Sequence, residues 1–456
     1  MHKKDELYQY QKQVVEEIKR RDRDRIACFL DMGLGKTIIS LTVCADLLEQ
    51  KQIKAVLVVA PKSVVNVWET ECANWEHTSH LRVSAIEGSA QKRLQRAEAD
   101  ADIYVVGRDN FAWLSCQIER LAGGCSEADM LILDESTSFK NRSTLRWKSL
   151  CQKGKRKQPL LKRFHRRLLL TGTPCSESYE GLFGQIYILD EGERLGKSIT
   201  KFRETYMIPD IIHNRVIYHR FYKEAIPQID AKIKDICISM KSEDYLQLPD
   251  KIDIVRWTGY KADATYEAMR KDGVVTVGDD TILAPDPAVR YGKLRQIASG
   301  FIYTEQHEAR WLHNHKKTAF AELLEELDGH NVLVFYQFDC EREWLQKEFR
   351  AELVDTPEQQ ARWNAGKIRV AVANPSSIGY GVNLQHGGNI IVFFTCPLSY
   401  EQYAQSVKRI HRNGQEKNVV KVIHLLAKGT IEETVYKLLK EQKADLLRSL
   451  MDAMKI

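Results

Sequence analysis

Short, uninterrupted apolar runs recur along the first half of the chain, and polar or glycine-containing segments separate them. The runs are RIACFL (25–30), AVLVVAPKS (55–63), IYVVG (103–107), MLILDE (130–135) and RRLLLTGTP (166–174). Runs of this length without alternation are typical of strands buried on both faces of a parallel sheet. The segment TIISLTVCADLLEQ (37–50) instead carries apolar residues at helical spacing. Strands that alternate with helices predict a doubly wound α/β domain.

The second half repeats this organisation. Its apolar runs are NVLVFYQF (331–338), IRVAVAN (368–374), NIIVFFT (389–395) and KVIHLLA (421–427). Helical segments such as CEREWLQKEFRAEL lie between them. The pattern predicts a second α/β domain, without a phosphate-binding loop of its own.

Composition adds limits to this picture. The 456 residues, 43% hydrophobic and 29% charged, suffice for two or three globular domains. No apolar run is long enough to span a membrane, and the N-terminus has no apolar signal region, so we expect a cytoplasmic protein. The ten cysteines form no C-x-x-C pair, which favours reduced thiols over a disulfide framework or a zinc site. A net charge of +6 is compatible with nucleic-acid binding.

The segment FLDMGLGKT (29–37) joins the first predicted strand to the first amphipathic helix. Gly33 and Gly35 let backbone N–H groups turn inward, and a helix N-terminus adds to the attraction for phosphate. Lys36 is placed to reach the β and γ phosphates, and Thr37 to hold Mg²⁺. The leading glycine of the usual phosphate-loop pattern is replaced by Leu30. The alternative is a glycine-bearing loop with a chance lysine.

Acidic residues follow another predicted strand. Asp134 and Glu135 end the run MLILDE, and open α/β sheets bind ligands at strand ends. Asp134 is a candidate ligand of Mg²⁺, and Glu135 a candidate base for the attacking water. An ordinary acidic turn is the alternative, but the next strand also ends in polar residues, at Thr171. Gln11 carries an amide that can pair with an adenine edge.

Arginines mark the second half. Gln405, Arg409 and Arg412 recur at helical spacing, which predicts that they share one face of a helix. Arginines that face a triphosphate from a neighbouring domain stabilise charge during phosphoryl transfer. A solvated basic helix is the alternative.

The segment QSVKRIHRNGQ (405–415) resembles motif VI of the Swi/Snf-type ATPases of helicase superfamily two. The other motifs follow in the family's order. Motifs I, Ia, II, III, IV and V are resembled by DMGLGKT, VVAPKSVVNVWETE, DESTSFKN, LLLTGTP, VLVFYQF and SSIGYGVNLQHGG. The resemblance covers almost the whole chain, and the residues of the motifs are most similar to those of the compact branch carried by phages and mobile elements.

This resemblance implies a fold of two RecA-like, doubly wound parallel-sheet lobes with helical protrusions between them. Lobe one is expected at 1–189, a helical protrusion and linker at 190–247, and lobe two at 248–429. A helical insertion is expected near 260–325, and a C-terminal helix at 430–456.

The implied activity is ATP hydrolysis with Mg²⁺, which drives closure of the lobes and movement along double-stranded DNA in a bacterial host cytosol. A strand-separating DNA or RNA helicase and a nucleotide-gated DNA-binding switch are the alternatives. The resemblance leaves open whether the protein also binds a phage or host protein partner.

The motif match also assigns residues. Catalytic roles fall to Lys36, Asp134, Glu135, Arg409 and Arg412. ATP contacts fall to Gln11, Gly33, Leu34, Gly35, Lys36, Thr37, Gly381, Asn383 and Gln405, with Thr37 and Asp134 at the metal. DNA contacts fall to Pro61, Lys62, Gln337, Ser376 and Ser377.

The chain departs from the family motifs at two positions. Thr137 replaces the histidine of motif II that often links the state of ATP to motif III. Pro375 replaces a threonine of motif V that touches a DNA phosphate, so Ser376 or Ser377 is expected to substitute for it.

The basic segment KGKRKQPLLKRFHRR (153–167) contains no acid. Because it precedes a predicted strand, it lies at the edge opposite to the strand ends that bind ligands. We therefore predict an auxiliary or bystander role in DNA binding.

Overall fold

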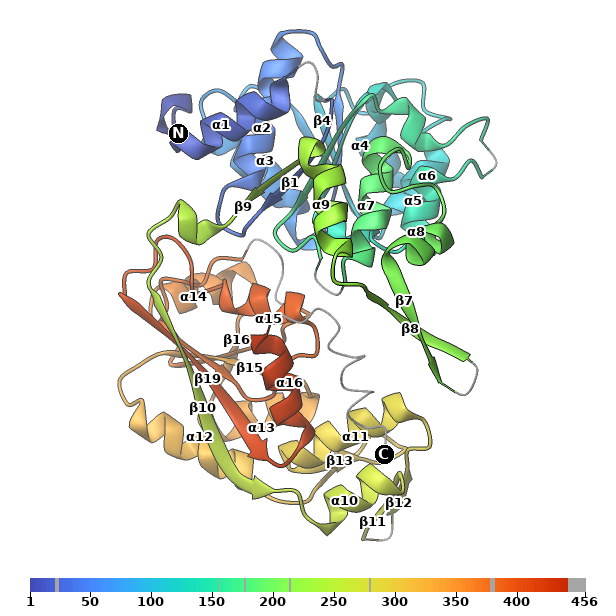
Figure 1. Ribbon diagram of the computed structural model, residues 1–456. Helices are drawn as coiled ribbons and strands as arrows, with labels where there is room; N and C mark the ends of the chain where they lie inside the picture. Colours follow the sequence, from blue (N-terminus) through green and yellow to red (C-terminus); the bar gives the residue numbers. More distant parts are fainter. Residues whose placement is uncertain are drawn as a thin grey trace. The chain divides into compact units, whose positions relative to one another are not determined.

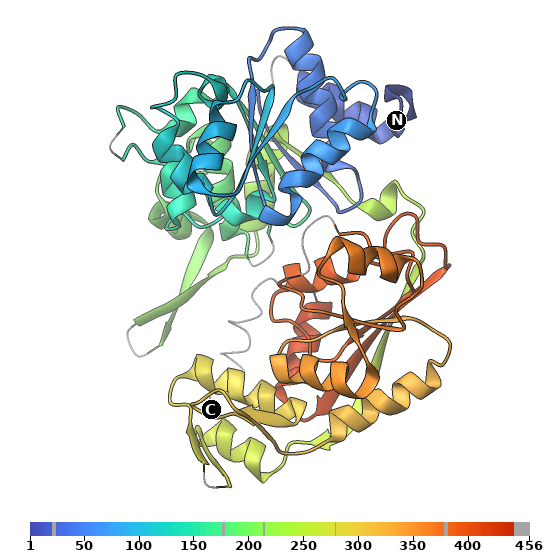
Figure 2. The ribbon, with the colours of Figure 1, turned by 180° about the vertical axis from the view of Figure 1, so that it is seen from behind.

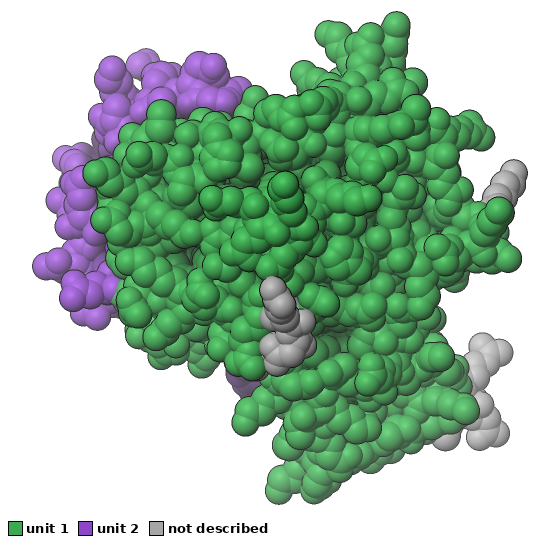
Figure 3. Space-filling view, turned by 90° about the horizontal axis from the view of Figure 1, so that it is seen from above, with its two compact units in different colours: residues 1–246 green, residues 247–456 purple. Residues whose placement is uncertain are grey.

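The computed structural model describes residues 1–20, 24–154, 156–175, 178–212, 215–278, 280–377 and 382–441. The described chain divides into two compact units, residues 1–246 and 247–456 (Figures 1 and 3). Each unit is built around its own parallel sheet.

Within the described part of the first unit, seven parallel strands form one sheet in the order β3-β4-β2-β5-β6-β1-β9. The strands are β1 (Arg25–Leu30), β2 (Val56–Ala60), β3 (Val83–Ile86), β4 (Ile103–Gly107), β5 (Met130–Asp134), β6 (Arg166–Thr171) and β9 (Cys237–Met240). All five apolar runs predicted to be strands in the first half are strands, which confirms the α/β fold class.

Helices lie on both faces of this sheet (Figures 1 and 2). They are α1 (Gln9–Lys19), α2 (Lys36–Glu49), α3 (Val65–Asn74), α4 (Ala90–Glu98), α5 (Phe111–Gln117), α6 (Leu145–Cys151) and α7 (Glu180–Asp190). Residues on both faces of a strand are therefore buried. Leu57 and Val59, on one face of β2, pack into one core cluster, and Val58, on the other face, is also inaccessible to solvent. Burial on both faces explains why these strands read as unbroken apolar runs.

The segment after α7 contains more than helices. Between α8 (Ile199–Tyr206) and α9 (Ala225–Ile233) the chain forms an antiparallel hairpin of β7 (Met207–Ile212) and β8 (Arg215–Phe221). Strand β9 then pairs with β1 as an edge of the first sheet. Residues 190–246 thus belong to the first compact unit.

Among the described residues of the second unit, six parallel strands form a sheet in the order β10-β19-β18-β15-β17-β16. They are β10 (Asp250–Lys261), β15 (Val332–Phe335), β16 (Glu352–Leu353), β17 (Val370–Ala373), β18 (Ile390–Phe393) and β19 (Val419–Lys428). The helices packed with it are α12 (His315–Glu326), α13 (Asp339–Phe349), α14 (Pro357–Asn364), α15 (Tyr400–Val407) and α16 (Ile431–Lys440). The predicted second α/β domain is confirmed.

The insertion near 260–325 contains helices together with hairpins. Helices α10 (Ala264–Lys271) and α11 (Pro287–Ser299) flank the hairpin of β11 (Val274–Val277) and β12 (Asp280–Leu283). A second hairpin, β13 (Phe301–Tyr303) with β14 (Ala309–Trp311), follows α11. The predicted C-terminal helix is described to residue 441, and its later residues lie outside the described part of the chain. Among the described residues, no helix combines the length and apolar character needed to cross a membrane.

The arginines of the basic segment 153–167 are largely engaged in holding the chain together. Arg156 donates to the carbonyls of Ser115 and Ser149, and Arg163 donates to the carbonyl of Ser126. Arg167 is 2% exposed and bonds to the carbonyls of Leu161, Phe164, Ile188 and Leu189 and to the carboxylate of Glu191. The segment enters β6 at its N-terminal end, opposite to the edge where Asp134 lies.

We expect Arg167→Leu to lower the free energy of unfolding of the first unit by about 3–5 kcal/mol, because Glu191 and several carbonyls lose a buried partner. Lys157→Gln, at an exposed position of the same segment, is the matched control and should change it by less than about 0.5 kcal/mol. Urea unfolding of both variants measures the difference. Equal stabilities of the two variants would contradict the structural role of Arg167.

Candidate nucleotide-binding site

The loop between β1 and α2 requires glycine at two positions. Gly33 and Gly35 have φ angles of 87° and 78°, in the left-handed region that L side chains rarely adopt. A Cβ on Gly35 would lie 2.3 Å from Nε2 of Gln11, so there is also no space for a side chain. Helix α2 begins at Lys36, directly after this turn, and its first N–H groups are available to an anion.

Helix α1 packs onto the loop through two neighbouring side chains. Nε2 of Gln11 donates to the carbonyl of Leu34 at 3.2 Å, and the hydroxyl of Tyr10 lies 3.4 Å from the same oxygen. Oε1 of Gln11 accepts from the N–H of Tyr8 at 3.0 Å. The structure thus brings Gln11 and Leu34 together. The amide of Gln11 keeps one further N–H and one further lone pair for a ligand.

The carboxylates Asp134 and Glu135 lie at the carboxyl end of β5. Burial and the neighbouring Glu135 raise the pKa of Asp134, while the ammonium of Lys36 opposes this rise. Strands β1 and β5 both pair in parallel with β6, so the loop that carries Lys36 and the carboxylates lie at the same edge of the sheet. Nζ of Lys36 also donates to the carbonyl of Leu30 at 3.1 Å. Nε1 of Trp68 donates to Oδ2 of Asp134 at 3.3 Å. The half-buried carboxylate of Asp134 lies next to the buried carboxylate of Glu135, and a divalent cation bound there would offset their mutual repulsion.

The hydroxyl of Thr171, the last residue of β6, contacts the candidate base directly. Its Oγ1 lies 3.1 Å from Oε2 of Glu135 and 2.9 Å from Oγ1 of Thr137, and it accepts the N–H of Thr173 at 3.1 Å. An ionised carboxylate only accepts, so Thr171 donates its single proton to Glu135. The hydroxyl of Thr137 must then donate to Thr171. The direction of the whole chain, Thr137 to Thr171 to Glu135, is therefore fixed.

In this chain Thr137 occupies the position at which the family's motif II has a histidine. Thr137 is 3% exposed and Thr171 is fully buried, so neither hydroxyl competes with water. A hydroxyl contact between motif II and motif III is thus present in this protein, made by different residue types. One oxygen of Glu135 is held by Thr171, which leaves the other to face a ligand.

In the second unit, Arg409 and Arg412 contact Val382 and Asn383, the first described residues after a part of motif V that lies outside the described residues. Helix α15 ends at Val407, so Arg409 and Arg412 lie beyond it in turns, and the prediction that they share a helical face with Gln405 is wrong. The physical reason is a tertiary contact: the carbonyl of Arg409 accepts the N–H of Leu384, and its guanidinium donates to the carbonyl of Val382 at 3.0 Å.

Arg412 and Asn383 contact each other through the guanidinium and the side-chain oxygen. Burial lowers the pKa of Arg412, and among the described residues no acceptor lies within hydrogen-bond distance of its buried Nε. Gln405 is buried on α15 and donates to Glu401. The structure therefore gathers Asn383, Arg409 and Arg412, whereas Gly381 lies outside the described residues.

The residues predicted to contact DNA follow the carboxyl ends of strands. In the first unit, Pro61 and the exposed Lys62 come directly after β2. In the second unit, Gln337 follows β15, while Ser376 and Ser377 are exposed after β17. Pro375 is buried, so the exposed hydroxyls of this loop belong to the two serines.

The loop that carries Gln337 is fixed by a buried carboxylate. Oε2 of Glu341, on the first turn of α13, accepts the N–H groups of Gln337 and Phe338. Its Oε1 accepts from the hydroxyls of Ser299 and Thr395. Glu341 is 1% exposed, and it holds the loop rigidly enough to present Gln337 at a fixed place.

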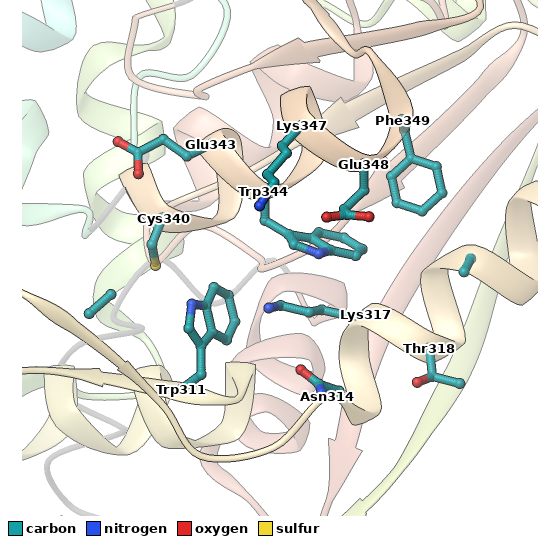
Figure 4. Close-up of a pocket in the computed structure, with 12 residues that line it drawn as sticks. Trp311, Asn314, Lys317, Thr318, Cys340, Glu343, Trp344, Lys347, Glu348 and Phe349 are labelled. Carbon is teal, nitrogen blue, oxygen red and sulfur yellow. The ribbon is translucent and has the colours of Figure 1, made fainter.

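A cavity of about 830 Å³ opens between α12 and α13, apart from the predicted nucleotide contacts (Figure 4). The indoles of Trp311 and Trp344 flank the ammonium of Lys317, whose Nζ lies 3.0 Å and 5.4 Å from the two ring centroids. No sequence motif indicated this cavity. Its cation–π contacts rigidify the packing of α12 against β14 and α13.

Comparison with known proteins now adds to this geometry. The family model described as SNF2-related domain matches residues 10–276. Putative protein p41 of Acyrthosiphon pisum secondary endosymbiont phage 1 is 33% identical over 457 residues, which cover 95% of this chain and 96% of that protein. The chain belongs to the SNF2-related family. It is accordingly an ATP hydrolase of helicase superfamily two.

Other relatives of this SNF2-related chain are longer proteins. The CHD3-type chromatin-remodeling factor CHR7 of Arabidopsis thaliana is 26% identical over 453 residues, which cover 90% of this chain and 34% of that protein. The chain thus spans about a third of the length of this plant relative. A solved structure, the Sulfolobus solfataricus SWI2/SNF2 ATPase core in complex with dsDNA, aligns with a TM-score of 0.45 at 21% identity, covering 98% of this chain and 93% of that one.

We expect Thr171→Val to lower kcat for ATP hydrolysis about tenfold or more, because Glu135 loses the charge-assisted bond that orients it. Thr171→Ser keeps a hydroxyl and should restore most of the rate. Steady-state ATPase of the three proteins, with KM for ATP measured alongside, tests this. A near-normal kcat in Thr171→Val together with a low kcat in Thr171→Ser would show that packing of the methyl group, and no hydrogen bond, matters here.

Proposed function

We propose that this SNF2-related protein is a DNA-dependent ATPase that moves along double-stranded DNA by ATP-driven closure of its two lobes. The observation that carries the proposal is the grouping of Lys36, Asp134 and Glu135 at one edge of the first sheet, in a chain of this family. A binding module or scaffold has no need of a lysine, a metal-type carboxylate and a base together.

In the first unit, the phosphates of ATP bind at the N-terminus of α2, between Gly33 and Thr37. Lys36 moves from the carbonyl of Leu30 to the β and γ phosphates, and Gln11 contacts the adenine. Glu135 orients the attacking water and accepts its proton.

Thr37 and Asp134 would hold Mg²⁺, which would supply positive charge against the negative charge that develops on the phosphates. Support comes from the raised pKa of Asp134, since a carboxylate crowded by burial and by Glu135 gains from a nearby cation. Among the described residues, no group of three or more His, Cys, Asp and Glu side chains gathers as a metal cage. A site with few protein ligands suits Mg²⁺, which retains water and phosphate ligands.

In the second unit, Arg409 and Arg412 act as fingers on the phosphates in the closed form, together with Gly381, Asn383 and Gln405 as nucleotide contacts. The buried Nε of Arg412 supports this role, because the described residues offer it no acceptor. Closure then couples the hydrolytic step to the position of the lobes.

DNA contacts come from Pro61 and Lys62 in one lobe and from Gln337, Ser376 and Ser377 in the other. Contacts of this type reach the phosphate backbone, so binding is insensitive to sequence and falls with rising salt. The net charge of +6 is consistent with such a partner.

We expect double-stranded DNA to activate ATP hydrolysis more than single-stranded DNA or RNA does. The measurement is ATPase activity with each nucleic acid and without any, at matched nucleotide concentration and constant salt. Displacement of a third strand from a triplex, with little separation of a duplex, is the companion result for a tracking enzyme. Strong activation by RNA with none by duplex DNA would reject the proposed substrate.

We expect Lys36→Ala and Glu135→Gln to fail in different ways. Lys36→Ala should weaken ATP binding, because a charge on the β and γ phosphates is lost. Glu135→Gln should keep binding and lose at least about a hundredfold in kcat, since the base is removed. Fluorescent-nucleotide binding beside steady-state ATPase separates the two effects, and Glu127→Gln at an exposed position before β5 is the control. Near-normal turnover in Glu135→Gln would reject this base.

A further inference from the structure

The first residue of the phosphate loop is bonded to a segment more than two hundred positions away in sequence. The backbone N–H of Asp31 donates to the carbonyl of Met240 at 3.1 Å. Oδ2 of Asp31 accepts the hydroxyl of Ser242 at 2.9 Å and the N–H of the same residue at 3.2 Å. Ser242 is 4% exposed, so water does not compete for these bonds. The segment that follows β9 therefore fixes where the loop begins.

The same segment also reaches the end of the loop, through an aromatic contact. The ring of Tyr245 lies 5.2 Å from the ring of Tyr10, centroid to centroid. Tyr10 in turn places its hydroxyl 3.4 Å from the carbonyl of Leu34. Positions 31 and 34 of the loop are thus both held, one directly and one through Tyr10, by residues 240–245.

These residues are also the last of the first compact unit, because the second begins at residue 247. Asp31 is therefore bonded directly to the stretch of chain that leads into the second unit. No motif quoted from the sequence includes Ser242 or Tyr245.

We propose that residues 240–245 form a wall of the nucleotide cradle. Ser242 and Tyr245 are positioning residues, which act on bound nucleotide through Asp31 and Tyr10. This inference rests on the proposed binding of ATP phosphates between Gly33 and Thr37.

The physical reason is preorganisation. The loop contains two glycines in left-handed conformation, and glycine loses more conformational freedom on ordering than any other residue. Bonds that hold the loop at Asp31 and Leu34 reduce the freedom that nucleotide binding has to remove. Thermodynamic linkage makes this effect reciprocal. If the bonds of Ser242 raise the affinity for nucleotide by some factor, bound nucleotide must raise the equilibrium constant for formation of those bonds by the same factor.

The variants that test the proposal are Ser242→Ala and Tyr245→Ala in the full chain, with Mg²⁺–ADP carrying a fluorescent label as the probe. Each should raise the Kd about three- to tenfold, the worth of one hydrogen bond or one ring contact, and raise KM for ATP more than it lowers kcat. Ser239→Ala, exposed on the same strand β9, and Tyr245→Phe, which keeps the ring, are matched controls. Both controls should bind as the unaltered protein does.

Hydrogen exchange in the unaltered protein is the second measurement, and it does not depend on any variant. Addition of Mg²⁺–ADP should slow exchange at the amide of Ser242 and leave exchange in the hairpin of β11 and β12, in the second unit, unchanged. A purely structural role of Ser242 would alter stability without this response to nucleotide.

Unchanged affinity in Ser242→Ala and Tyr245→Ala would overturn the inference, as would exchange at Ser242 that ignores nucleotide. Lys36→Ala distinguishes this failure from a failure of the proposed function. Loss of nucleotide binding in Lys36→Ala, with none in the other two variants, would reject the wall and retain the site. Full binding in Lys36→Ala would reject the site itself.

Discussion

Parallel pairing is the constraint on which the rest of this structure depends. When every strand of a sheet points the same way, all the carboxyl ends lie at one edge, and the loops that follow them are brought close together. In the first sheet β1 lies between β6 and β9, and β5 follows β6. The phosphate loop after β1 is therefore flanked by motif III on one side and by the segment after β9 on the other. The approach is close: a Cβ on Gly172 would lie 3.2 Å from the carbonyl of Leu30.

Crowding at this edge explains how the polar side chains there are held. Glu135 is oriented by Thr171 from the neighbouring strand, and Asp31 by Ser242 from the turn that follows β9 on the other side of β1. In the second unit Glu341 holds the loop of Gln337 in the same manner, through backbone N–H groups. These three loops are thus fixed by partners from other elements, which give them defined positions before any ligand arrives.

The sequence could predict much of the fold because the buried strands are unbroken apolar runs. Strands β9 and β10 were not predicted from the sequence, for different reasons. The four residues of β9 contain exposed Ser239, and β10 carries its apolar Ile252, Ile254 and Trp257 at exposed positions of an edge. Helical spacing failed at Arg409, because a tertiary contact with Val382 takes the chain off the helix. The partners of Asp31 and Glu135 could not be predicted, since they depend on which strands lie side by side.

The backbone φ angle of Glu135 is unfavourable for stability at a position of the candidate site. Glu135 has a φ of 50°, so a residue with a Cβ occupies a conformation that costs about 1–2 kcal/mol relative to the right-handed form. Glycine adopts this conformation without that penalty. Glu135→Gly would relieve this strain, but it would also remove the acceptor of the buried hydroxyl of Thr171. The strained glutamate lies at the candidate site, so a redesign that relieves this strain by removing its side chain would also remove the carboxylate that we propose as the base.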